Sequence, residues 1–237
     1  MKNLSFIFVL MFLISCQSNH QADVASSTDY LANIKEELNR QSPENRTINL
    51  VFHGHSVPAG YFKTPLVNTF GSYPFLLLKQ LKAYYPFAVI NVINTAIGGE
   101  NSKSGAARFD ADVLIHKPDV IFIDYGLNDR PIGLGRACNA WEAMIEKSLE
   151  KNIKVVLLTP SPDLTTDILD LESELAKHAA QIRNLSQKYG VGLVDVFEKF
   201  RQIAASGDSL SRYMSQLNHP NEKGHAVIAG EMLKFFK

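Results

Sequence analysis

Short apolar segments rich in β-branched residues recur along the chain, separated by longer stretches of mixed polarity. They lie at residues 48–52, 88–93, 120–125, 154–159 and 191–196. Runs of this length and composition are typical of parallel strands that are buried on both faces. The pattern therefore predicts five strands of one parallel sheet.

Between the apolar runs, apolar residues repeat every three or four positions, which is the spacing of an amphipathic helix. Such stretches cover residues 74–85, 141–151, 175–189, 198–205 and 222–236, and Gly190 provides a stop signal after the third of them. Strands alternating with helices predict a three-layer α/β/α sandwich. For five parallel strands we expect the flavodoxin-like order 2-1-3-4-5.

The first residues do not fit this alternation. Residues 1–15 contain a lysine followed by an apolar stretch, which predicts a signal peptide, and Cys16 follows directly. Residues 13–16 resemble the lipobox of bacterial lipoproteins, which implies a lipid on Cys16. The alternative is an ordinary secretory signal with an incidental cysteine. The polar residues up to position 28 suit a flexible tether, so we expect the folded domain at residues 29–237.

Composition narrows the function classes. Lys plus Arg and Asp plus Glu both number 24, and no basic run is present, so nucleic acid is not an expected partner. After Cys16 only Cys138 remains, which excludes an internal disulfide. We expect an extracytoplasmic, membrane-anchored lipoprotein, facing the periplasm or the cell surface, whose stability comes from packing.

Candidate chemistry follows the predicted strands, at the sheet edge where ligands of such folds bind. Ser56 lies in a Gly-containing loop after the first run, where a hydroxyl can act as a nucleophile. Gly99 follows the second run and Asn128 the third, and both positions can supply N–H donors to an oxyanion. His219, held in a loop by Pro220, is a candidate general base.

In this order and after these strands, Ser56, Gly99, Asn128 and His219 resemble the four residues that name the SGNH, or GDSL-like, hydrolase superfamily. The resemblance covers nearly all of the chain after the leader. It implies that the serine attacks an ester carbonyl while the histidine transfers the proton. It further implies an oxyanion hole made of the serine and glycine N–H groups and the asparagine amide.

The chain departs from the family pattern at two positions. His55 stands where the family usually has the aspartate of Gly-Asp-Ser, and Gln216 stands where it usually has the triad aspartate, three residues before the histidine. Without that acid the tautomer of His219 must be fixed by another group. The candidates are a backbone carbonyl of residues 211–218, the amide oxygen of Gln216, and Asp195; we favour the first two, because Asp195 is more typical of a helix cap.

Other motifs allow alternative interpretations. The tetrapeptide at residues 207–210 reads Gly-Asp-Ser-Leu, but it follows a helical pattern, so we interpret Ser209 as a loop residue in a helix cap. His53 and His55 form a His-x-His pair, yet the further ligands of a metal-dependent hydrolase are missing. We therefore expect no metal and no cofactor, and a hydrogen-bonding role for both histidines.

Four aromatic residues, Tyr61, Phe62, Tyr73 and Trp141, are candidates for a substrate pocket. Only Tyr61 and Phe62 are expected near the site, and the other two in the core. We expect Asp129 and Arg130 to form a local charged pair.

By analogy, the expected activity is removal of acyl groups, chiefly acetyl groups, from a small-molecule or polysaccharide ester. The alternatives are a non-catalytic glycan-binding lipoprotein, and a short-chain lipid esterase or thioesterase.

Overall fold

The computed structural model describes residues 29–237. The predicted signal peptide, Cys16 and the tether lie outside the described residues. Within the described range, no helix is long and apolar enough to cross a membrane.

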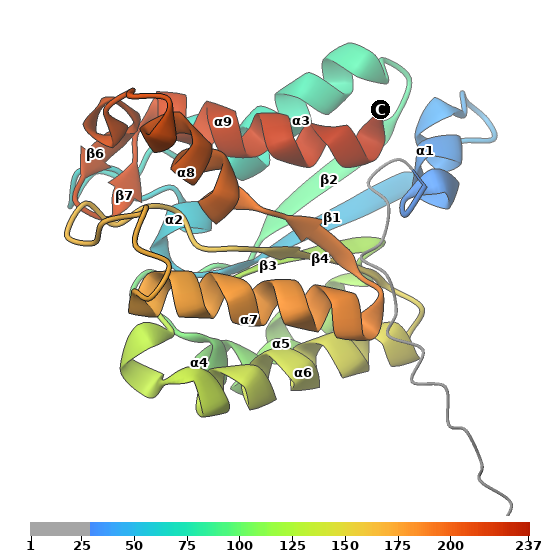
Figure 1. Cartoon of the computed structure of the whole chain (residues 1–237). Coiled ribbons are helices and arrows are strands. Elements are labelled where there is room, and N and C mark those ends of the chain that lie inside the picture. Colours follow the sequence, from blue (N-terminus) through green and yellow to red (C-terminus); the bar gives the residue numbers. More distant parts are fainter. Residues whose placement is uncertain (1–28) are drawn as a thin grey trace, which may run out of the picture.

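Five parallel strands form the central sheet (Figure 1). They are β1 (Thr47–Gly54), β2 (Val89–Asn94), β3 (Val120–Asp124), β4 (Lys154–Leu158) and β5 (Gly192–Val194). Their spatial order is β2-β1-β3-β4-β5, which confirms the predicted topology. The order changes direction at β1, so the loops after β1 and β3 lie side by side at the carboxyl edge.

Helices cover both faces of the sheet and complete the predicted three layers (Figure 1). One face carries α1 (Ala32–Asn39), α3 (Tyr73–Tyr84), α8 (Val196–Ala205) and α9 (Glu222–Leu233). The other carries α4 (Ser102–Ala107), α5 (Phe109–Asp112), α6 (Leu134–Glu150) and α7 (Glu174–Tyr189). Short 3-10 helices lie at Thr69–Gly71, Leu114–His116, Arg130–Ile132, Leu210–Tyr213 and Lys234–Phe236.

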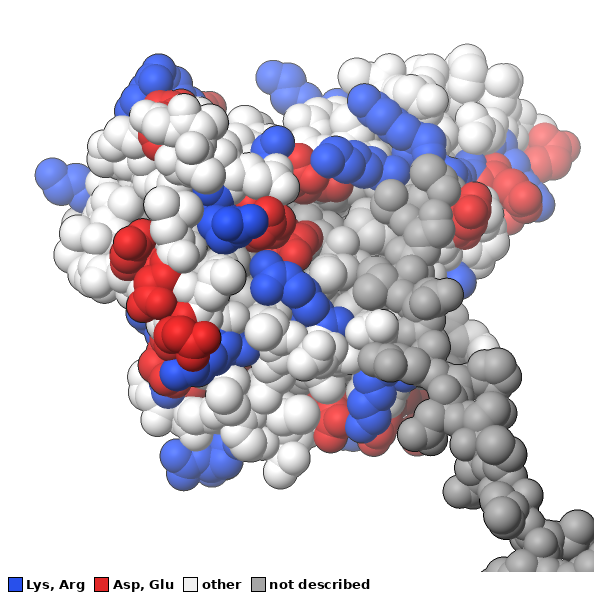
Figure 2. All heavy atoms as spheres, in the orientation of Figure 1, with Lys and Arg blue, Asp and Glu red and all other residues white. Residues whose placement is uncertain are grey.

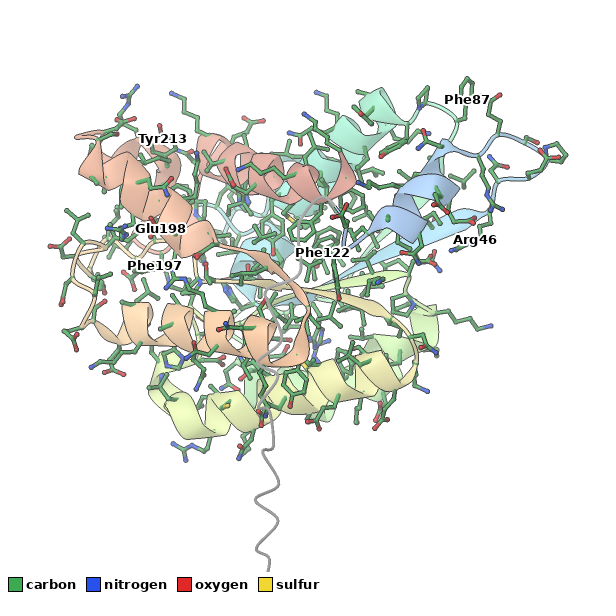
Figure 3. All side chains as sticks on the ribbon, turned by 45° about the vertical axis from the view of Figure 1, so that its right-hand side comes forward. Arg46, Phe87, Phe122, Phe197, Glu198 and Tyr213 are labelled. Carbon is green, nitrogen blue, oxygen red and sulfur yellow. The ribbon has the colours of Figure 1, made fainter. Side chains whose placement is uncertain are left out.

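The sheet separates two hydrophobic cores, because successive side chains of a strand point to opposite faces. Phe52 and Phe122 stack on the α3/α9 side with ring centroids 4.7 Å apart, and Figure 3 places Phe122 at the centre of the molecule. Val51 and Ile121 point to the α5/α6 side. Burial of each such side chain contributes about 1.5–3 kcal/mol, which fixes the strand register.

Three small elements at the carboxyl edge build the site. Helix α2 (Ser56–Ala59) follows β1 almost directly. The strands β6 (Met214–Gln216) and β7 (His219–Pro220) form a short antiparallel hairpin that contacts α2. Figure 1 shows α2 and this hairpin at the same end of the molecule.

Candidate active site

Ser56 and His219 meet at this edge. Ser56 Oγ lies 2.9 Å from His219 Nε2, although the two residues are 163 positions apart in the chain. Their exposed fractions are 7% and 6%. A nearly buried hydroxyl and imidazole within hydrogen-bond distance form a pair through which a proton can move.

Two glycines shape the turn that presents Ser56. A Cβ on Gly54 would lie 2.3 Å from the backbone oxygen of Asp124, so only glycine allows β1 and β3 to approach so closely here. Gly60 ends α2 with a φ of 90°, in the left-handed region that favours glycine. Ser56 therefore lies at a sharp bend between a buried strand and a single helical turn.

The second ring nitrogen of His219 faces two groups. Nδ1 lies 2.8 Å from the backbone oxygen of Phe62 and 2.8 Å from Gln216 Nε2. Gln216 Oε1 accepts a hydrogen bond from the Thr64 backbone N–H at 3.0 Å, which fixes the amide with its nitrogen toward His219. The carbonyl at Nδ1 is thus supplied by Phe62, on the loop after α2.

The prediction of a carbonyl from residues 211–218 is therefore wrong, and so is the prediction of the Gln216 amide oxygen. The hairpin turns His219 toward α2, so the nearest free carbonyl belongs to a segment distant in sequence. Asp195 accepts hydrogen bonds from Thr159, Arg183 and the Glu198 backbone N–H, which caps α8. Its interpretation as a structural cap is confirmed.

Burial lowers the pKa of His219, the Phe62 carbonyl acts in the opposite direction, and nearby His55 lowers the pKa further. The imidazole is consequently neutral near pH 7. A neutral ring with Nδ1–H directed at Phe62 leaves the Nε2 lone pair facing Ser56.

Gly99 and Asn128 lie in the loops after β2 and β3. Gly99 has a φ of 80°, and a Cβ there would meet nothing within 4 Å. Asn128 Nδ2 donates to the Glu100 backbone oxygen at 3.0 Å, which uses one of its two amide hydrogens. Among the described residues, no backbone oxygen accepts from the N–H of Ser56 or Gly99.

Asp129 ties these two loops together. Its carboxylate accepts from the Ser102 backbone N–H at 2.8 Å and from Trp141 Nε1 at 2.7 Å. Arg130 instead binds Asp163 at 2.6 Å. The predicted Asp129–Arg130 pair is wrong, because the first side chain points into the core beneath the loop and the second points away from it.

A pocket of about 570 Å³ adjoins the loops of Gly99 and Asn128. Its lining also includes Asn101, Leu127, Arg130, Pro131 and Glu174. The charges are compensated, since Arg130 is paired with Asp163 and Glu174 with Lys177 at 3.3 Å. The pocket thus offers hydrogen-bonding groups without a net charge.

The two alternative motifs serve structural roles. Ser209 is the N-cap residue of Leu210–Tyr213, without a side-chain capping bond, and its Oγ contacts Ser211 on the exposed surface. His53 bonds with Thr95 and with the Gly105 backbone oxygen. Within residues 29–237, no group of three or more His, Cys, Asp or Glu side chains is arranged to hold a metal ion.

The aromatic residues lie as expected. Tyr61 and Phe62 border the pair, with the Tyr61 ring centroid 6.0 Å from that of His219. Tyr73 and Trp141 are buried in the cores.

On the face shown in Figure 2, acidic and basic side chains are interspersed.

A serine–histidine pair at the carboxyl edge of a parallel sheet is an arrangement found in hydrolases that use a serine nucleophile. The chain belongs to the GDSL-like lipase/acylhydrolase family, whose model matches residues 52–227. It is an ester hydrolase.

Two relatives share low sequence identity with this chain. An acetylxylan esterase of Geobacillus stearothermophilus is 24% identical over 204 residues, which cover 78% of this chain and 92% of the relative. The uncharacterized lipoprotein YqeF of Bacillus subtilis (strain 168) is 33% identical over 81 residues, or 31% of this chain and 33% of the relative.

Among solved structures, a two-domain esterase active on acetylated mannans superposes with a TM-score of 0.72 at 20% identity. The match covers 91% of this chain and 54% of that one, so the chain spans about half the length of the two-domain esterase.

Proposed function

We propose that this chain removes acetyl groups from a carbohydrate, with Ser56 as nucleophile and His219 as general base. One observation carries the proposal: Ser56 Oγ lies 2.9 Å from His219 Nε2, while Nδ1 of the same ring faces the Phe62 backbone oxygen. This arrangement supports a dyad in which a carbonyl takes the place of the triad acid.

In the proposed reaction, Ser56 Oγ attacks the acetyl carbonyl carbon while its proton passes to His219 Nε2. The tetrahedral intermediate collapses, the sugar oxygen leaves, and His219 returns the proton to it. Water then attacks the acetyl-serine with the same proton transfers, releasing acetate and restoring the Ser56 hydroxyl. The cycle balances without a metal or a redox partner.

The oxyanion of both intermediates would be held by the backbone N–H groups of Ser56 and Gly99 and by the Asn128 amide. Support comes from the two N–H groups lacking backbone acceptors among the described residues, and from the link between Asn128 and Glu100 that joins the two loops. Donors fixed before substrate arrives stabilise developing charge without reorganisation.

A carbohydrate substrate is supported by the esterases of acetylated xylan and mannan among the similar proteins. The pocket beside Gly99 and Asn128 also supports it, because about 570 Å³ exceeds what an acetyl group fills. Its compensated charges favour a neutral sugar over a uronic acid.

A lipid ester is the second candidate, because apolar side chains are exposed on loops around the pair. Leu66, on the loop after α2, and Leu217, between β6 and β7, are each 58% exposed. An apolar rim of this kind suits an acyl chain or a lipid surface. The two candidates differ in their expected dependence on acyl-chain length.

The test is hydrolysis of 4-nitrophenyl acetate, butyrate and octanoate, and of acetylated xylan and mannan, by the purified chain and two variants. Ser56→Ala should abolish release of acetate, while the control Ser209→Ala should retain it. If the wild type and Ser56→Ala are equally inert on every ester, the proposal is wrong and a glycan-binding role replaces it. Preference for octanoate would favour the lipid ester.

We further propose that a lipid on Cys16 anchors the enzyme outside the cytoplasm. The similarity to a lipoprotein over 81 residues supports this. Replacement of Cys16 by Ser should move the protein from the membrane fraction to the soluble fraction, and an unchanged distribution would contradict the anchor.

A further inference from the structure

His55, immediately before Ser56, is fully buried and occupies the position where the family usually has aspartate. Its Nδ1 accepts the Val57 backbone N–H at 3.2 Å and lies 3.5 Å from Ser56 Oγ. Its Nε2 lies 3.4 Å from Asp124 Oδ1, at the end of β3. Apart from this long contact, neither of these two atoms has a polar partner among the described residues.

The contact with Val57 settles the tautomer of His55. A backbone N–H can only donate, so Nδ1 must carry a lone pair and the ring proton must reside on Nε2. The nearest charged group to that nitrogen is the carboxylate of Asp124, 3.4 Å away, whose other oxygen accepts from the Tyr73 hydroxyl at 3.0 Å. A buried carboxylate behind Nε2 stabilises this tautomer over the one with the proton on Nδ1.

The cap matters because α2 is a single turn of four residues. Few hydrogen bonds hold so short a helix, and one of them is donated by the Val57 backbone N–H to the side chain of its N-cap residue, His55. A second link runs through the backbone, where the His55 N–H donates to the Asp124 oxygen at 3.2 Å. The end of β3 thereby holds the start of α2 from two sides.

We propose that His55 and Asp124 act together as positioning residues for Ser56. The carboxylate favours the tautomer with the proton on Nε2, which leaves Nδ1 to accept the Val57 N–H. Nδ1 then fixes the first turn of α2 so that Oγ faces His219 and the Ser56 N–H faces the substrate. The family usually has an acidic residue at position 55. In this chain the acidic residue is Asp124, and it acts on Ser56 through the imidazole of His55. This inference rests on the proposed role of Ser56.

The test compares substitutions that keep or remove the cap. Asparagine at position 55 places Oδ1 where Nδ1 lies, whereas alanine leaves the Val57 N–H without an acceptor. We expect His55→Ala to lower kcat for 4-nitrophenyl acetate by about tenfold, the scale of a lost helix cap, with KM within about twofold of wild type. His55→Asn should retain kcat within about threefold.

His53→Asn is the matched control. His53 is another buried histidine, two residues earlier, with no contact to Ser56 among its hydrogen bonds. The His53→Asn variant should have a lower melting temperature than wild type and an unchanged kcat. Equal losses of kcat in His53→Asn and His55→Ala would reduce the role of His55 to general stability and overturn the proposal.

A charge exchange tests the pairing even where His55→Ala fails to fold. His55→Asp alone places two carboxylates together in a buried site and should lose activity, whereas His55→Asp with Asp124→Asn should recover kcat to within about tenfold of wild type. A double variant no better than the single one would overturn the pairing, as would His55→Asn behaving like His55→Ala. A wild type as inert as Ser56→Ala would instead refute the proposed function itself.

Discussion

Gln216 offers the sharpest perturbation of the proposed base. The Phe62 carbonyl can accept a hydrogen bond from Nδ1 of His219, whereas Gln216 Nε2, also 2.8 Å away, can only donate one, so the two neighbours favour opposite tautomers. Only the tautomer with the proton on Nδ1 leaves Nε2 free to act as a base. In Gln216→Glu, one carboxylate oxygen keeps the bond to the Thr64 N–H and the other accepts from Nδ1.

The size of the expected pKa shift of His219 follows from the distance between its ring and a carboxylate at position 216. Opposite charges about 4 Å apart interact by about 4 kcal/mol at an effective dielectric constant near 20, which corresponds to an upper limit of about 3 pKa units. Gln216 is only partly buried, so solvent reduces this. We expect the pKa of His219, now lowered by burial, to rise by about 1–2 units.

The assay is the pH dependence of kcat/KM for 4-nitrophenyl acetate. The base must be neutral, so a higher pKa moves the acid limb of the profile up by about 1–2 pH units. The plateau above that limb should rise by up to about tenfold, because a charged partner stabilises the imidazolium better than a carbonyl does. The two profiles should therefore cross, with the variant less active at low pH and more active on the plateau.

Gln216→Met, which has a similar length and no charge, is the control and should leave the acid limb in place. If Gln216→Glu folds with an unchanged melting temperature and its acid limb coincides with that of wild type, His219 is not the group that titrates. The assignment of the base would then be refuted.

Three further outcomes are expected. Asp195→Asn weakens a helix cap, so thermal denaturation should show a lower melting temperature, equivalent to about 1 kcal/mol of stability. Steady-state kinetics should give a kcat within about twofold of wild type. Asp129→Asn turns an amide donor toward Ser102 or Trp141, so unfolding in urea should show a loss of about 2 kcal/mol together with lower kcat; unchanged kcat would contradict the loop-tying role. Burial lowers the pKa of His53 to about 4. The unfolded state therefore binds the extra proton first as pH falls, so stability should be constant above about pH 7 and decline between about pH 6.5 and 4, less steeply in His53→Asn.

The fold was predictable because parallel strands buried on both faces appear as short apolar runs, and each was found within a few residues of its observed position. Helix α1 was missed because only Ile34 and Leu38 of its eight residues are buried in an otherwise polar segment. Helix α4 was missed because its small residues, such as Gly105, carry no apolar period. Neither segment shows the apolar repeat every three or four positions from which an amphipathic helix is predicted.

Side-chain chemistry was easier to predict than backbone chemistry. Ser56 and His219 could be named as a pair because their residue types and order carry a signal. The Phe62 carbonyl carries none, since every residue has one and only the fold decides which oxygen reaches Nδ1. The Asp129–Arg130 error has a similar cause, because adjacency in sequence does not tell which way each side chain points.

The separation of 163 positions between Ser56 and His219 has a consequence for biogenesis. During synthesis the proposed nucleophile is made early, while the hairpin that carries the proposed base is among the last segments to appear. A nascent or truncated chain lacking β7 holds Ser56 without His219, and under the proposed mechanism it should not hydrolyse esters. Ester hydrolysis by this enzyme therefore reports that the last segments of the domain have docked on the first, a long-range contact of the kind that forms late in folding.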